Sequence, residues 1–306
     1  MKTKQHAART GGIYGSRVTR WVFVGPAMLV VICLLVYPLL STLVYSFTNK
    51  TMIRPDFDVV GLKNYISLLT DEEFFLAFGH TLFWTVCSVL GQVIVGFIGA
   101  LCLNRVKNNV AKNMFRIFAI IPWAFPAIAT AMTWKWLLNG IYGFIPTMMK
   151  DLGLTEGLVQ FLSNSDLVLP TLVGINIWFG APLIMVNVYA ALQTIPRDQY
   201  EAAQIDGANA WQSFRYVTAP HIRTVVGLLV VLRTVWVFNN FDIIYMITGG
   251  GPAGASRTMP IFIYDTGWTG RLVGKASAAS ILLLLFLIIL CVLYFSVINR
   301  WEKEDG

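Results

Sequence analysis

The chain has 306 residues, of which 56% are hydrophobic and 13% are charged, and its mean hydropathy is +0.65. This composition excludes an ordinary soluble domain, so we expect an integral membrane protein. The formal charge of +7 does not indicate a nucleic-acid-binding protein, because membrane proteins carry Lys and Arg beside their cytosolic segment ends. The four cysteines lie inside apolar runs without metal-ligand spacing, which argues against a disulfide framework and a zinc site.

A basic tail, residues 1–20, precedes the first apolar stretch, residues 21–47. This stretch is too long for the core of a signal peptide, and no small-residue cleavage site follows it, so we expect an uncleaved first span. The polar residues 49–75 come next and include the sequence Val-Gly-Leu-Lys-Asn-Tyr at 60–65. We expect a short surface helix in this segment, before the second span.

Five further apolar stretches are each long enough to cross a hydrocarbon layer of about 30 Å. The predicted fold is therefore an all-α integral membrane protein with six spans and both termini on one side. Fourteen Lys and Arg residues lie on the side of the termini and eight on the opposite side, which predicts that the termini are cytosolic. The predicted spans are about 21–47, 76–103, 115–138, 167–192, 225–247 and 276–298.

The third span contains Pro122 and Pro126, one helical turn apart, so its backbone hydrogen bonding must be interrupted there. After this span, apolar residues recur between Ile141 and Leu152 with the spacing of an amphipathic helix on the outer membrane face. Two interpretations of that helix remain open: a docking platform for a partner, or a cover for the ends of the spans.

The long polar segment 194–222 predicts two short helices outside the membrane. Pro196 suits a first helical turn and Gly207 a left-handed end, so residues 197–206 form the first helix. Asn209 can cap the second helix, and Pro220 is expected to end it before the next apolar run. The result is a helix-turn-helix that a partner protein can contact.

One face of the first short helix suits close contact with another protein. Ala202 and Ala203 leave that face nearly flat, and Glu201 and Asp206 supply hydrogen-bond acceptors beside it. The alternative is an ordinary amphipathic cytosolic loop without a partner.

The pattern Glu-Ala-Ala, then Asp-Gly-Ala, an aromatic residue and a late proline resembles the cytosolic coupling loop of membrane subunits of binding-protein-dependent ABC importers. Ala219 stands where that family has Leu. The resemblance assigns contact with a separate ATPase to Glu201, Ala202, Ala203, Asp206, Gly207 and Pro220.

Residues 60–65, 238–245 and 248–252 resemble the sugar-type branch of these importers, and the resemblance covers nearly the whole chain. The chain is similar to the first permease subunit of maltose, trehalose and glycerol-phosphate systems. We expect it to lack the extra outer domain and the additional N-terminal spans of the larger maltose subunit. The implied fold is the type I permease core in residues 21–306, in a bacterial cytoplasmic (inner) membrane. The implied partners are a homologous second permease subunit, two ATP-binding subunits, an extracytoplasmic solute-binding protein, the sugar and membrane lipid.

Polar side chains inside spans are costly and generally face a bundle interior or a cavity. Amides pair with sugar hydroxyls, aromatic rings pack on C–H surfaces, and glycine leaves room. An aromatic residue can stand at Leu183 in the family, and this departure leaves the identity of the sugar open. The alternative is interhelical amide hydrogen bonding at a subunit interface. By resemblance, the substrate-path residues are Asn176, Phe179, Gly180, Leu183, Trp236 and Asn240.

Arg233 also lies inside a span, where its permanent charge needs water, a carboxylate or carbonyl groups, either near a gate or in a structural ion pair. No catalytic or phosphate-binding motif occurs in the chain. We therefore expect a permease subunit rather than an enzyme, with no metal or cofactor of its own and with ATP and magnesium on the partner ATPase chains.

The resemblance implies that the chain forms half of a translocation path for a sugar or oligosaccharide, opened by alternating access. A permease for glycerol phosphate or a polyol remains an alternative. A secondary transporter is less favoured, because intramembrane carboxylates for ion coupling are missing from the spans and Asp242 lies only at a span end.

Overall fold

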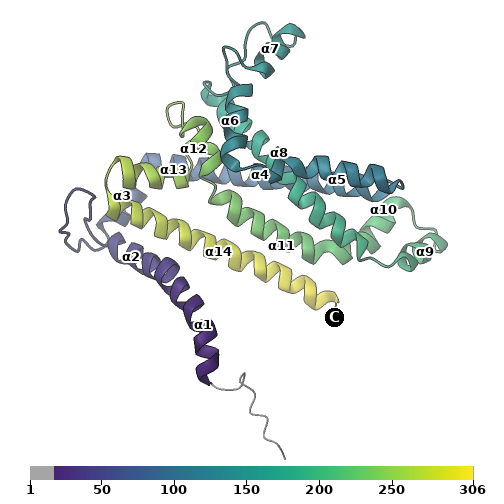
Figure 1. Ribbon diagram of the computed structural model, residues 1–306, viewed down its shortest axis with the longest axis horizontal. Coiled ribbons are helices and arrows are strands. Elements are labelled where there is room, and N and C mark those ends of the chain that lie inside the picture. The colour runs from purple at the N-terminus through teal and green to yellow at the C-terminus, as the bar shows by residue number, and fades with distance from the viewer. Residues whose placement is uncertain (1–16, 306) are drawn as a thin grey trace, which may run out of the picture.

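The computed structural model describes residues 17–305, and its regular elements are helices joined by loops (Figure 1). The only β-type pairing within these residues is an isolated bridge between Thr48 and Val59. The helices are α1 (Arg17–Val31), η1 (Ile32–Val36), α2 (Tyr37–Ser46), α3 (Lys63–Leu69), α4 (Glu72–Arg105), α5 (Asn109–Ala124), α6 (Ala127–Leu137), α7 (Phe144–Asp151), α8 (Ser165–Gln193), α9 (Arg197–Ile205), α10 (Ala210–Ser213), η2 (Phe214–Thr218), α11 (Ala219–Phe238), α12 (Asp242–Thr248), α13 (Met259–Tyr264), η3 (Asp265–Thr269) and α14 (Val273–Asp305).

The centre of the bundle is the close pairing of α4 with α8. Gly96 allows this approach, because a Cβ atom there would lie 2.7 Å from Cβ of Ile184. Gly99 does the same one turn later against the side chain of Met185. Small residues of this kind let two membrane helices approach closely where lipid supplies no hydrophobic force between them.

The first span is one helical run, Trp21–Ser46, with a π-helical turn at η1. Its second half, α2, packs against α14, whereas α1 leaves the bundle (Figure 1). None of the most apolar window of this run is buried within the chain. The first span therefore presents its apolar surface outward, to lipid or to another subunit.

The third predicted span is broken, as the two prolines indicate. The helices α5 and α6 meet at 92°, and Pro126 lies at the N-cap position of α6. The span predicted as 115–138 is therefore not one straight helix. The fifth predicted span, 225–247, is also divided: α11 ends at Phe238, and α12 begins at Asp242 after a short loop.

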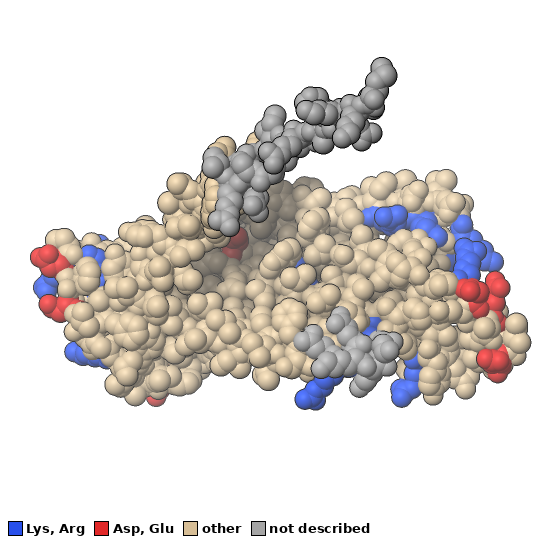
Figure 2. Space-filling model, turned by 90° about the horizontal axis from the view of Figure 1, so that it is seen from below, with Lys and Arg blue, Asp and Glu red and all other residues tan. Residues whose placement is uncertain are grey.

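The three remaining predicted spans fall inside long helices, α4, α8 and α14. In the part of the chain that is described, five helices are long and apolar enough to cross a membrane, or six if α5 and α6 count as one span. Charged side chains gather at the two ends of the elongated body, with fewer charged side chains between them (Figure 2). This distribution matches a bundle whose long axis crosses the membrane.

The helix ends are tied together at the end of the bundle that carries α3 and α13. Asn64 Nδ2 donates to the carbonyl oxygens of Ser46 and Thr48, at 2.9 and 2.8 Å, where α2 ends. The Lys275 ammonium lies 2.7 Å from the Asp71 carboxylate, and its hydrogen bond holds the pKa of Asp71 below the usual range. The predicted short surface helix is α3, and the 60–65 sequence positions Asn64 in its first turn.

Candidate coupling surface and substrate path

The first short helix of the predicted coupling loop is α9, and its C-terminal end is a Schellman motif. Ala208 N–H donates to the carbonyl of Ala203 at 2.9 Å, and Gly207 N–H to that of Gln204 at 3.1 Å. Gly207 has φ +78°, in the left-handed region that favours glycine. The prediction that the helix turns at Gly207 is confirmed.

The second short helix begins as predicted, with a capping box. Asn209 Oδ1 accepts from the N–H of Gln212 at 2.9 Å, and Gln212 Oε1 accepts from the N–H of Asn209 at 2.8 Å. The prediction that Pro220 ends this helix is wrong, because α10, η2 and α11 form one continuous run. Proline lacks an N–H, and the π-helical turn directly before it, closed by Ala219 N–H on the Phe214 carbonyl, accommodates this loss.

Two side chains hold the short helices against the membrane-spanning bundle. The Tyr200 hydroxyl lies 2.9 Å from Thr218 Oγ1 and so links α9 to η2. The Phe214 ring makes an edge-to-face contact with Phe97 of α4, with ring centroids 5.9 Å apart. These contacts connect α9 to η2, and η2 to α4. Sequence reasoning did not single out Tyr200, and the only signal for it was an aromatic residue inside a polar helix.

The outer surface of the two short helices combines exposed apolar and acidic side chains. Ile205 is 87% exposed and Trp211 66% exposed, and Glu201, Ala202 and Asp206 are exposed beside them. Large apolar side chains at a polar end of the molecule indicate a protein-binding surface. The structure thus places five of the six predicted coupling residues together at the end of α9, four of them exposed and Ala203 partly buried, whereas Pro220 lies partly buried in the following helix.

The bundle interior contains a cluster of polar side chains from α4, α8 and α11, which we call the central cluster: Gln92, Asn176 and Arg233. Arg233 Nε donates to Gln92 Oε1 at 2.8 Å, and Gln92 Nε2 donates to the Asn176 carbonyl at 2.9 Å. All three residues are buried. Gln92 was missed by sequence reasoning, although an amide within an apolar span was the available signal.

Two predicted path residues adjoin the central cluster. A Cβ atom at Gly180 would collide with Arg233 Nη2 and with the Gln92 amide, so glycine is what lets these side chains reach α8. Trp236 is 57% exposed, and its ring centroid lies 5.8 Å from Arg233 Cζ, within cation–π range. Asn176, Gly180 and Trp236 are thus brought together around Arg233.

The other three predicted path residues are less closely joined to this cluster. Phe179 packs against the main hydrophobic core, and Leu183 is half-buried. Asn240 lies in the loop between α11 and α12, where its Oδ1 atom is buried without a hydrogen-bond partner among the described residues. An unpartnered buried amide oxygen is a candidate contact for a ligand hydroxyl.

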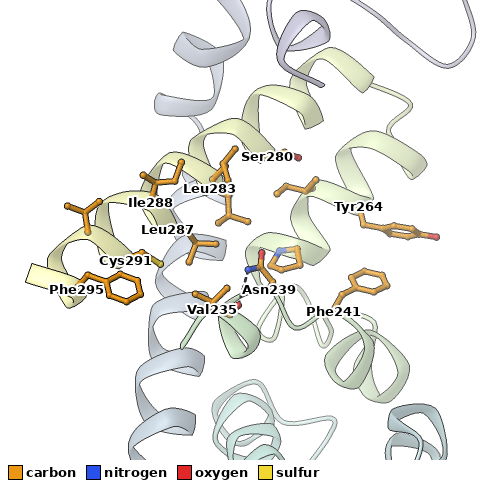
Figure 3. A pocket seen from close by; sticks show the side chains of 14 residues that line it. Val235, Asn239, Phe241, Tyr264, Ser280, Leu283, Leu287, Ile288, Cys291 and Phe295 are labelled. Atoms are coloured by element: carbon orange, nitrogen blue, oxygen red, sulfur yellow. Dashed lines mark hydrogen bonds between the residues drawn. The ribbon is translucent and has the colours of Figure 1, made fainter. Parts of the chain in front are cut away.

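A large cavity lies elsewhere, between α11, α13 and α14 (Figure 3). Its volume is about 820 Å³, and most of its lining is apolar, with Leu283, Leu287 and Ile288 on one side. None of the predicted path residues lines it. Its position separates it from the central cluster, so the predicted path and this groove use different surfaces of α11.

Residues 92–303 match the family described as the inner membrane component of binding-protein-dependent transport systems, and the chain belongs to this family. It is therefore a non-catalytic, membrane-spanning permease subunit of an ABC transporter, and ATP is hydrolysed on separate subunits. The predictions of an all-α type I permease fold and of this family are confirmed.

Curated relatives cover most of the chain. It is 32% identical to the trehalose/maltose transport system permease protein MalF of Thermococcus litoralis, over 93% of this chain and 94% of the relative. It is 28% identical to the diacetylchitobiose uptake system permease protein DasB of Streptomyces coelicolor, over 99% and 95%. The fold also matches a bacterial ABC transporter that imports the acidic polysaccharide alginate, with a TM-score of 0.81, 22% identity and coverage of 92% and 95%.

Proposed function

We propose that this chain forms half of the translocation path of an ATP-driven importer for a sugar or oligosaccharide delivered by a soluble binding protein. Support comes from the relatives, which are named for trehalose and maltose, maltodextrin and diacetylchitobiose. The central cluster adds amide groups and the exposed Trp236 ring, which suit hydroxyls and the C–H face of a sugar.

The observation that carries the coupling role is the exposed turn between α9 and α10. This turn is shaped by its own capping hydrogen bonds, exposes Ile205 and Trp211, and is fixed to α4 and α11 through Phe214 and Tyr200. In this proposal the turn inserts into a cleft of the partner ATPase, and ATP-driven closure of two such subunits moves the ends of α4 and α11. Glu201, Ala202, Ala203, Asp206 and Gly207 form the contact, and Pro220 supports it from α11.

The need for further partners follows from the central cluster of this subunit. One subunit with one central cluster lines only part of a path, so a homologous second permease subunit completes it. The chain itself needs no cofactor, since ATP and magnesium bind to the two ATPase subunits. The termini and the α9–α10 turn lie on the cytosolic side of the inner membrane, where fourteen of the Lys and Arg residues are.

Reconstitution tests this function. We expect proteoliposomes that contain this chain, the second permease subunit and the ATPase to accumulate maltotriose or another oligosaccharide when ATP and the loaded binding protein are present. Omitting the second permease subunit should abolish accumulation. Concentrative uptake by this chain and the ATPase alone, or ATP-independent uptake driven by an ion gradient, would contradict the proposal.

A further inference from the structure

We propose that the transported substrate carries an oxyanionic group, a carboxylate or a phosphate, and that this group binds to Arg233 in the central cluster. The inference rests on the proposed function and specifies its substrate class. It starts from the charge of Arg233, which is only 5% exposed within an apolar helix. A guanidinium group does not lose its proton in a protein, so the charge persists wherever the side chain is buried.

The side chains that the structure describes include no counter-ion for this charge. Among the described side chains, Arg233 makes a hydrogen bond to the Gln92 amide and a cation–π contact with the Trp236 ring, and the ion pairs of these side chains do not include it. The helices α4 and α8 contain acidic residues only in their first turns, and α11 contains none. Burying an unpaired cation is costly, and intramembrane charges of this kind commonly mark a substrate or ion pathway.

The hydrogen-bonding groups of the central cluster are mainly donors. A guanidinium has five N–H donors, and Arg233 uses only Nε, which leaves the donors on Nη1 and Nη2 free in the described part of the chain. Asn176 is 2% exposed, and its Nδ2 donor is buried without a partner. The Gln92 Oε1 acceptor is already occupied by Arg233. Such a set matches a carboxylate or phosphate, whose oxygens only accept.

The surroundings of Arg233 leave space for a sugar beside the anion. Gly180 lets the guanidinium lie against α8, because any side chain there would collide with Nη2. The Trp236 ring, mostly exposed, lies beside the same guanidinium and offers a flat apolar face. A uronic acid unit or a phosphorylated sugar or polyol presents both features, a C–H surface and an oxyanion.

A structural role is the alternative: Arg233 links α11 to α4 through Gln92 and contacts no substrate. This role uses one of the five donors and leaves the charge unpaired. The two roles predict different ligand preferences, which the complete transporter can reveal without its binding protein.

The test is saccharide binding to the complex of this chain, the second permease subunit and the ATPase, in lipid nanodiscs, measured by saturation-transfer NMR titration. The probes are trigalacturonate, glucose 6-phosphate and maltotriose. We expect one anionic probe to bind about tenfold or more tightly than maltotriose, as charge-assisted hydrogen bonds imply. Which of the two binds distinguishes a carboxylate from a phosphate.

Variants of Arg233 test whether this residue causes the preference for an anionic probe over maltotriose. Arg233→Gln should lower the ratio of anion affinity to maltotriose affinity by about tenfold, whereas Arg233→Lys should keep most of this ratio. Arg105→Gln, at the exposed end of α4, is the matched control and should behave as wild type. Size-exclusion chromatography checks assembly. If Arg233→Gln does not assemble, the inference is tested by the ratio of anion affinity to maltotriose affinity in the wild-type complex and in Arg233→Lys.

Two results would overturn this inference without contradicting the proposed function. One is a wild-type complex that binds maltotriose at least as tightly as both anionic probes. The other is an Arg233→Gln complex with the wild-type ratio of anion affinity to maltotriose affinity. Those results establish the structural role of Arg233 and leave sugar transport intact. A wild-type complex that binds no saccharide, together with no uptake in reconstitution, would instead contradict the proposed function.

Discussion

At the scale of single residues, two glycines are needed for opposite physical reasons. At Gly207 nothing lies within 4 Å of a potential Cβ atom, so space is plentiful, but φ of +78° disfavours other residues. At Gly180 the backbone is helical, but Arg233 and Gln92 occupy the space of a Cβ atom. Gly207 therefore depends on backbone conformation and Gly180 on packing.

Gly180→Ala should lower the stability of the assembled complex, because the added methyl group displaces Arg233 and Gln92. Overpacking of this kind costs about 1–3 kcal/mol. The matched control is Gly174→Ala, also on α8, where nothing lies within 4 Å of the added atom and helix propensity favours alanine. Thermal unfolding of both purified complexes measures the difference. Equal midpoints for the two variants would show that the central cluster is not packed as described.

The unpartnered amides give a second prediction at this scale. Asn176 Nδ2 and Asn240 Oδ1 have no hydrogen-bond partner in the chain as described, so alanine at either position should cost little stability. If they contact substrate, uptake at limiting substrate should fall by about tenfold, since an unpaired hydroxyl costs about 1–3 kcal/mol. Asn239→Ala is the control, because its Nδ2 already bonds to the Val235 carbonyl. Unchanged uptake in both variants would favour a role at a subunit interface.

At the scale of elements, local rules explain which parts were predictable. Capping residues at Gly207 and Asn209 specify α9 and the start of α10, and both were identified from sequence. The continuation of the helix through Pro220 was not predicted, because it depends on a π-helical turn that no residue type indicates. Gln92 was missed because its role requires knowing which helix faces α11.

Tyr200→Phe tests the link between α9 and η2. Loss of the 2.9 Å contact with Thr218 removes about 0.5–1.5 kcal/mol, so the α9–α10 turn should follow α11 less closely. We expect a two- to tenfold reduction, on the order of that energy, in ATPase stimulation by the loaded binding protein. Tyr216→Phe, on the exposed face of η2, should retain wild-type stimulation. Equal stimulation in the two variants would show that this hydrogen bond is not part of the coupling.

The ion pair between Lys275 and Asp71 predicts a pH dependence of stability. The pKa of Asp71 is lowered in the folded chain, so the pair stabilises the fold fully above the unfolded pKa, about 3.9, and loses this effect as the pH falls through the folded value. Lys275→Met should therefore unfold at a lower temperature than wild type at pH 7. This difference in unfolding temperature should become smaller below about pH 4. Lys63→Met changes an exposed side chain of α3 and should unfold at the wild-type temperature at every pH. A difference for Lys275→Met that persists undiminished at pH 3 would exclude this ion pair as its source.

At the scale of the whole molecule, composition and charge distribution predicted an all-α bundle, because apolar length and Lys and Arg positions are properties of sequence alone. A break between α5 and α6 was predicted, but its angle of 92° was not, because neighbouring helices set the direction of α6. The outward departure of α1 was also not predicted, because a uniformly apolar stretch does not show what it packs against.

The topology gives a prediction at the same scale. A cysteine introduced at Asn209, in a chain without its four native cysteines, should react with a membrane-impermeant maleimide only when the cytosolic side is accessible. A cysteine at Leu154, exposed after α7, should react from outside. The reverse pattern would place the α9–α10 turn outside and exclude contact with a cytosolic ATPase.

The most direct test of the coupling role is receptor-stimulated ATP hydrolysis by complexes with a changed α9–α10 turn. Gly207→Val forces a β-branched residue to φ of +78°, and Glu201→Lys places a cation on the flat alanine surface. Both should insert normally, yet bind the ATPase poorly or show no stimulation by the loaded binding protein, whereas Gly207→Asn should keep most of it, because asparagine tolerates this conformation. Wild-type assembly, stimulated hydrolysis and uptake in both Gly207→Val and Glu201→Lys would contradict the account.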